Sequence, residues 1–298
     1  MELSGGGISA LENGGARLTL SGSVWNIEVT EQSGEVKTYT ASDMRTFDFC
    51  VRGNRLELFW RGRDLTVRAA VVCEGEALRF RVAVASDGAG INRVVYPVFG
   101  GISPIAGRGE EDTLLLPWQN GVLIKDPAHT LLRNTELPFW MGRGGGKYEN
   151  EYPAQYSYQF FAYYSRDSHG LYFSTEDGGA YIKTVGFYRN DDCDGFDFAL
   201  TNYPENMGIE RYYDMPYDFV FRFFKGDWQT AANLYRAWAV HQPWSQNSRG
   251  RELPHAARRV DFFRINHESY ALGTRTEEYA ATCELLQRRL DCTVAAHW

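Results

Sequence analysis

The sequence predicts a mainly β protein: a large antiparallel sandwich of two sheets, followed by a linker helix and the first β-α-β of a truncated (β/α)₈ barrel. Three observations support this. Residues 1–225 alternate apolar and polar side chains with a period of two, residues 226–244 have helical periodicity, and residues 255–298 begin a strand, helix, strand succession. We therefore expect a sandwich at 1–225, a clamp helix and linker at 226–254, and an incomplete barrel start at 255–298.

The sandwich prediction rests on a series of hairpins. The clearest is divided at Gly75, and its apolar positions are Leu65, Val67, Ala69, Val71 and Cys73 before the turn and Leu78, Phe80, Val82 and Val84 after it. Arg79 and Arg81 alternate with the apolar residues of the second strand, so one face of the hairpin is expected to be buried and the other exposed to solvent. Later strands are predicted at 94–99, 113–116, 159–164, 170–175, 180–188, 196–201 and 217–224. More than a dozen strands without an intervening helix predict two packed sheets, because a single open sheet rarely grows so wide.

Residues 101–158 depart from this rhythm, with long loops rich in Trp and Tyr. Long loops in a compact domain are usually functional or disordered, and this density of aromatic residues argues against disorder. Trp118 and Trp140 are the best candidates for rings that stack on a sugar, and Gln119 and Gln155 are candidates for hydrogen bonds to its hydroxyls. The alternative is that these rings pack the loops onto the sheet or onto a following domain.

Residues 226–244 predict one helix that joins two domains. Asp227 is a suitable N-cap and Pro243 a suitable end. An apolar stripe follows helical spacing, at Trp228, Ala231, Ala232, Tyr235, Trp238 and Ala239. Such an aromatic stripe needs an apolar partner, so we expect the helix to clamp the sandwich to whatever follows it.

The remaining residues predict a parallel β-α-β unit, with strands at 259–265 and 292–296 and a helix at 276–290. The most economical continuation is a (β/α)₈ barrel, whose ligands bind at the carboxyl ends of the strands. This makes His267 and Glu268, after the first strand, and His297 and Trp298, after the second, candidate substrate-binding residues. The alternative is that they are ordinary loop residues.

Composition excludes several classes of function. A formal charge of −7 with no long basic run argues against nucleic acid or membrane partners. Five scattered cysteines and six histidines without metal-binding spacing predict neither a disulfide framework nor a metal site, and no cofactor motif is present. The first residues lack the pattern of a signal peptide. If the start is native, the chain is expected in the cytoplasm; otherwise the compartment is unknown.

Taken together, the sandwich, the clamp helix of the form GDW-x₂-AA-x₂-YR-x-W-x₃-QPW and the first barrel strand resemble the N-terminal part of bacterial glycoside hydrolases. The kind and order of these segments are similar to those of uncharacterised glycosidase-like proteins related to endo-α-N-acetylgalactosaminidases. In those proteins the sandwich is galactose mutarotase-like. The phrases LPWQNGVLI, QFFAYY and HGLYFSTED fit the same sandwich. The resemblance implies an oligosaccharide, polysaccharide or glycoconjugate as partner, and docking of the sandwich onto a barrel that is missing here.

The resemblance implies that the sandwich supports the catalytic barrel of a glycoside hydrolase, and that one of its loops contributes to the sugar-binding site. The catalytic carboxylates are unknown and expected beyond Trp298, since the families resembled carry them on later barrel strands; the 298-residue chain alone is expected to be inactive. Two alternatives stay open. The sandwich could be a non-catalytic carbohydrate-binding or structural module, or it could be an aldose epimerase or polysaccharide lyase.

Overall fold

The computed structural model describes residues 1–4, 6–105, 111–133, 146–166, 168–190, 192–247, 260, 262–265 and 276–297. The chain divides into two compact units, Met1–Gln242 and Pro243–Trp298, which we describe separately.

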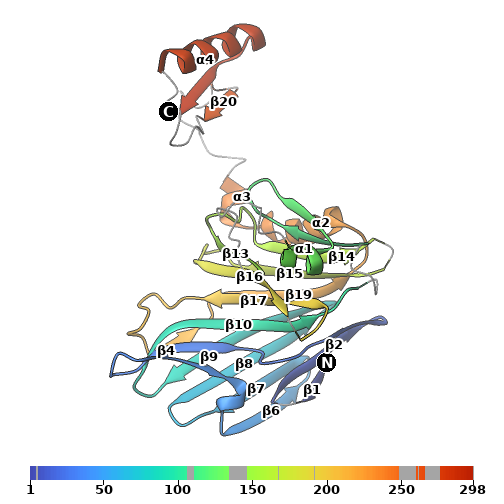
Figure 1. Ribbon diagram of the computed structural model, residues 1–298, viewed down its shortest axis with the longest axis vertical. Coiled ribbons are helices and arrows are strands. Elements are labelled where there is room, and N and C mark those ends of the chain that lie inside the picture. The colour runs from blue at the N-terminus through green and yellow to red at the C-terminus, as the bar shows by residue number, and fades with distance from the viewer. Residues whose placement is uncertain are drawn as a thin grey trace. The chain divides into compact units, whose positions relative to one another are not determined.

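The described residues of the first unit form three antiparallel sheets, and Figure 1 shows their strands. The smallest has the order β1 (Glu2–Ser4), β2 (Gly7–Asn13), β3 (Ala16–Thr19). A six-stranded sheet has the order β13 (Lys147–Tyr152), β16 (Lys183–Asn190), β17 (Gly195–Asn202), β10 (Gly90–Ile102), β4 (Asn26–Thr30), β5 (Val36–Thr40). A ten-stranded sheet has the order β12 (Val122–Lys125), β11 (Asp112–Leu116), β14 (Phe160–Ser165), β15 (Gly170–Glu176), β19 (Asp218–Phe224), β9 (Ala77–Ser86), β8 (Leu65–Glu74), β7 (Arg55–Arg61), β6 (Thr46–Arg52), with β18 (Tyr212–Asp214) also paired to β9. Helical segments of this unit are η1 (Ala41–Asp43), α1 (Pro127–Arg133) and α2 (Trp228–Ala239).

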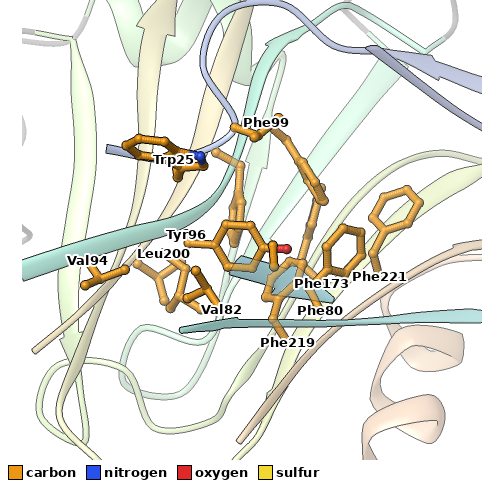
Figure 2. Close-up of a cluster of buried hydrophobic side chains, with 14 of the residues drawn as sticks. Trp25, Phe80, Val82, Val94, Tyr96, Phe99, Phe173, Leu200, Phe219 and Phe221 are labelled. Carbon is orange, nitrogen blue, oxygen red and sulfur yellow. The ribbon is translucent and has the colours of Figure 1, made fainter. Parts of the chain in front are cut away.

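The two large sheets pack face to face around an aromatic core. Phe173 of the ten-stranded sheet stacks on Phe198 of the six-stranded sheet, with ring centroids 4.6 Å apart and planes at 12°. Phe99 of β10 meets Phe221 of β19 edge to face at 5.4 Å, and Figure 2 shows this cluster. Stacked and edge-to-face rings of this kind add to the free energy gained from burial. The predicted fold class, a mainly β antiparallel sandwich, is confirmed.

The alternation seen in the sequence explains which side chains form this core. Leu65, Val67, Ala69 and Val71 of β8 are all at most 5% exposed, as are Phe80, Val82 and Val84 of β9. Cys73, which continues the same pattern, is exposed at the end of the strand. The period of two therefore identifies the buried face correctly except where the hairpin leaves the sheet.

One prediction about the sandwich is wrong: a helix does interrupt the strands. Helix α1 (Pro127–Arg133) begins with proline, which suits a first helical position because it has no N–H to leave unpaired. Its seven residues are too few to show helical periodicity in the sequence. Besides β11, which matches the strand predicted at 113–116, the strands β12 and β13 give residues 101–158 more regular structure than long loops would have.

Helix α2 packs on the outer face of the ten-stranded sheet. The Asp227 side chain accepts a hydrogen bond from the Gln229 N–H, which confirms the predicted N-cap. Tyr235 stacks on Phe160 of β14 at 5.0 Å, and Ala231 is fully buried. The apolar stripe therefore fastens the helix to the sandwich.

Two details of the predicted helix differ from the structure. Trp228, the first residue of the helix, is 42% exposed, whereas Ala231 and Tyr235 in the following turns are buried. The helix ends at Ala239 rather than at Pro243, since the N–H groups after Val240 form shorter-range bonds, such as His241 to the Trp238 carbonyl. Pro243 instead begins the short helix α3 (Pro243–Asn247).

In its described residues, the second unit contains α3, β20 (Phe262–Ile265), α4 (Thr276–Leu290) and β21 (Val294–His297). The two strands pair in parallel, from Phe262 opposite Val294 to Ile265 opposite His297. This confirms a parallel β-α-β arrangement, while its continuation into a barrel stays a prediction. None of the described helices combines the length and apolar composition that crossing a membrane requires.

Candidate functional site

Three predicted site residues from the aromatic loops lie together at the end of β11. Trp118 forms an antiparallel bridge with Tyr156, and the Gln119 N–H donates to the Gln155 carbonyl over 3.2 Å. The side chains of Gln119 and Gln155 are exposed, whereas Trp118 is partly buried and packs against the main core. The arrangement fits the packing alternative for Trp118 better than a free ring, and its role in binding stays a prediction.

For the other predicted site residues, the structure gives little or no information on their surroundings. Trp140, His267, Glu268 and Trp298 lie outside the described residues. His297 ends β21, where its backbone pairs with Ile265.

A cavity rich in tyrosine lies elsewhere, where β18 and the loop before it meet the β15–β16 connection. We name it the tyrosine pocket; its volume is about 220 Å³. Its lining includes five tyrosines, three carboxylates and three further residues: Tyr181, Tyr203, Tyr212, Tyr213, Tyr217, Glu205, Glu210, Asp214, Ile182, Pro204 and Pro216. Tyr181 and Tyr212 are 45% and 59% exposed, whereas Tyr213 and Tyr217 are buried.

The loop that forms one wall of the tyrosine pocket is fixed to strand β10. The Gly208 N–H donates to the Ile91 carbonyl, and the Ile91 N–H donates to the Glu210 carbonyl. This close approach requires glycine at position 90, because a Cβ there would lie 1.9 Å from the Gly208 carbonyl oxygen. The Asn206 side chain also donates to Glu210 over 2.7 Å, so the wall is held by several bonds at once.

A buried charged pair lies behind the tyrosine pocket. The Lys183 ammonium donates to Asp177 over 2.5 Å and to the Tyr181 carbonyl over 2.7 Å. It also lies over the rings of Tyr152 and Tyr217, at 4.8 and 4.5 Å from their centroids. These contacts fix the backbone and rings from which the pocket is built.

Burial governs the acid-base properties of these groups. Burial lowers the pKa of Lys183 to about 8, against the opposing effect of Asp177. Burial raises the pKa of Tyr213 and that of Tyr217, so both hydroxyls are protonated near neutral pH. The tyrosine pocket therefore offers neutral aromatic rings beside a rim of carboxylates.

Sequence reasoning missed this site. The segment NYPENMGIERYYDMPY, residues 202–217, has more tyrosines for its length than the loops at 101–158. That aromatic density was the available signal. The assembly itself depends on pairing between β18 and β9, such as Tyr213 opposite Val84, which local periodicity does not reveal.

Comparison with solved structures places this fold among known proteins. The chain is similar to the α-N-acetylgalactosaminidase NagBb from Bifidobacterium bifidum in its GalNAc complex, with 12% identity and a TM-score of 0.59, over 97% of this chain and 48% of that one. The ligand-free form of the same enzyme gives 13% identity and a TM-score of 0.60, with the same coverage of both chains. At this identity the likeness establishes the fold alone, and the chain spans about half the length of these structures.

A galactose mutarotase-related enzyme from Lactobacillus acidophilus also matches, at 10% identity and a TM-score of 0.40, over 66% of this chain and 78% of that one. The family model described as "Domain of unknown function (DUF6259)" matches residues 213–298. That match begins within β18 and includes helix α2 and the β-α-β unit. No curated protein matches the sequence.

Proposed function

We propose that this chain supplies the sandwich of a carbohydrate-active enzyme, a glycoside hydrolase, and that the tyrosine pocket holds part of its sugar ligand. The observation that carries the binding proposal is the combination of exposed Tyr181 and Tyr212 with the carboxylates Glu205, Glu210 and Asp214 around one cavity. The C–H groups on one side of a pyranose ring pack on the face of an aromatic ring, while carboxylates accept hydrogen bonds from its hydroxyls.

The assignment to glycoside hydrolases is supported by fold and by order along the chain. The match to an α-N-acetylgalactosaminidase extends over 97% of this chain. The parallel unit β20–α4–β21 after the sandwich is consistent with the start of a (β/α)₈ barrel. We propose that helix α2, already fastened to the sandwich through Tyr235, docks the sandwich onto that barrel.

Glycosidic cleavage needs two carboxyl groups on opposite sides of the scissile bond, one as acid and one as nucleophile or base. We assign this chemistry to the barrel of the whole protein and to no residue of this chain. The sandwich contributes binding and support.

The epimerase and lyase alternatives require a histidine in the ligand groove, and the described histidines are placed differently. His129 lies between Asp126 and Asp194, at 2.8 and 3.4 Å, and His169 lies against the ring of Phe223. No histidine of the described ranges lines the tyrosine pocket. A non-catalytic sugar-binding module remains the second candidate, and the same pocket would serve it.

The test is titration of the purified 298-residue chain with galactose, glucose and N-acetylgalactosamine, followed by calorimetry or NMR. Saturable binding that Tyr181→Ala weakens at least about tenfold, equivalent to about 1.4 kcal/mol, would support the proposal. Phe49→Ala is the control, since Phe49 is a similarly exposed ring on β6 outside the pocket. Absence of binding to all three sugars would overturn the pocket assignment. Hydrolysis of aryl glycosides by this chain would overturn the assignment of catalysis to the barrel.

A further inference from the structure

A second, larger cavity adjoins the tyrosine pocket on the outer face of the ten-stranded sheet. We name it the arginine groove; its volume is about 460 Å³, within the usual range for ligand sites. Its lining comes from β7, β8, β9, β18 and the start of β19: Arg55, Arg68, Ala70, Val72, Glu74, Arg79, Arg81, Val82, Ala83, Tyr212, Asp214 and Asp218. Tyr212 and Asp214 line both cavities, so the two adjoin at β18.

The outer face of this sheet has two halves of different chemistry. The half formed by β11, β14 and β15 carries apolar side chains such as Phe160 and Tyr172, and helix α2 covers it through Ala231 and Tyr235. On β9 and β8 the same face carries charged side chains instead, including Arg79, Arg81 and Arg68. Helix α2 therefore accounts for the apolar half, and the charged half forms the groove.

The register of the strands explains why the charged half is hollow. Ala70 of β8 is opposite Arg81 of β9, and Arg68 is opposite Ala83. Large and small side chains therefore alternate across the strand pair. The alanines form a low floor, and the arginines rise as walls around it.

The arginine side chains are held in place by carboxylates. Glu57 accepts from Arg68 over 2.7 Å and from Arg55 over 2.9 Å. Asp218 bridges Arg81 and Arg79, and Arg79 also contacts Glu74 and Glu176. A guanidinium group has five N–H donors, so each of these bonds leaves others to face a ligand. The network presents donors and acceptors that are oriented before anything binds.

The charge balance decides which class of ligand fits. Four guanidinium groups are accompanied by five carboxylates: those of Glu57, Glu74, Glu176, Asp214 and Asp218. The groove therefore has no excess of positive charge that would attract an anionic ligand. Hydroxyl groups both donate and accept, so they match a surface in which N–H donors alternate with carboxylate oxygens.

We propose that the arginine groove binds an uncharged, hydroxyl-rich oligosaccharide that continues from the tyrosine pocket across Tyr212. This inference rests on the proposed function, since it extends the same sugar ligand into a second cavity. The tyrosine pocket holds one end of the ligand by ring stacking, and the groove holds the following sugar units by hydrogen bonds. The groove thus sets a preference for longer, neutral glycans.

The test uses the 298-residue chain and an array of uncharged galactose-, glucose- and N-acetylgalactosamine-containing oligosaccharides of increasing length, together with sialylated and sulfated forms. Ala70→Leu fills the floor without removing an ion pair, and Thr66→Leu adds the same side chain on the same strand and face outside the groove. We expect affinity to rise with length for uncharged glycans, and Ala70→Leu to abolish that rise while Thr66→Leu preserves it. Thermal melting checks that both variants fold.

The outcomes separate the two proposals. If single sugars bind through Tyr181 and Ala70→Leu behaves like Thr66→Leu, the groove proposal is overturned and the tyrosine pocket stands. If Ala70→Leu abolishes binding while Tyr181→Ala has no effect, the groove stands and the tyrosine pocket assignment fails. Preference for sialylated or sulfated glycans would overturn the neutral ligand class, and no binding at all would overturn both proposals.

Discussion

Lys183 and Asp177 form an ion pair in which each side chain is only 1% exposed. Asp177 also accepts hydrogen bonds from the backbone N–H groups of Gly179 and Tyr181, so its carboxylate organises the turn that brings Tyr181 to the tyrosine pocket. Removing two charges from water is costly, and an intact pair with further hydrogen bonds offsets much of that cost. The pair therefore connects the stability of the sandwich to the shape of its candidate site.

The first prediction concerns that pair. Lys183→Met should lower the free energy of unfolding by about 3–5 kcal/mol, because the Asp177 carboxylate would stay buried without its partner. The double variant Asp177→Asn with Lys183→Met should recover part of the loss, since neither charge remains. Urea denaturation of the wild type and the two variants measures this. Equal stability of Lys183→Met and the wild type would show that the pair is unimportant.

The second prediction concerns helix α2. Tyr235→Ala should cost about 3 kcal/mol, because it removes a buried ring that stacks on Phe160 and leaves a cavity under the helix. Trp228→Ala is the matched control on the same helix: its ring is 42% exposed, so the cost should stay below about 1 kcal/mol. Thermal or chemical denaturation compares the two. A larger effect at Trp228 would contradict the packing described for the helix.

The sequence predicts those parts of the fold that depend on local periodicity. The buried faces of β8 and β9, the cap at Asp227 and the bounds of α4 all follow from side-chain spacing within a few residues. The prediction that Arg79 and Arg81 lie on the solvent-facing side of the hairpin is also correct, because both line the arginine groove on the outer face of the sheet.

The candidate site could not be predicted in the same way, because it depends on contacts between distant strands. Pairing of Phe219 with Phe80 brings β19 beside β9, and pairing of Tyr213 with Val84 adds β18 next to it. Only after these pairings do Tyr212 and Asp214 lie between two cavities. Trp118 illustrates the same difficulty: aromatic density makes it a candidate for stacking on a sugar, and in the structure its ring also packs against the core. Composition alone does not distinguish these two uses of an aromatic side chain.

The third prediction tests how the wall of the tyrosine pocket is held. Gly90→Ala should displace the loop that contains Gly208, because the added Cβ would lie 1.9 Å from the Gly208 carbonyl oxygen. We expect a loss of stability together with weakened sugar binding. Gly53→Ala is the control, since its positive φ of 59° makes alanine costly by about 1 kcal/mol but nothing lies within 4 Å. If both variants keep full sugar binding, the loop does not depend on that contact.

The fourth prediction concerns the pH dependence of stability in the arginine groove. Hydrogen bonds from Arg68 and Arg55 lower the pKa of Glu57 from 4.5 to about 2. Because the folded state binds this proton less tightly than the unfolded state, the Glu57 contribution is complete above pH 4.5 and is lost as the pH falls toward 2. Melting temperatures of the wild type should therefore fall through this window.

The variants Glu57→Gln and Arg68→Met separate this effect from general acid unfolding. Gln keeps an oxygen that can accept from arginine but cannot be ionised, so its curve should be flatter between pH 4.5 and about 2. Arg68→Met removes the largest cause of the lowered pKa and should flatten the curve in the same direction. Curves parallel to the wild type in both variants would mean that the Glu57 pairs do not persist in solution. The groove would then lack the fixed donors and acceptors on which recognition of an uncharged glycan depends.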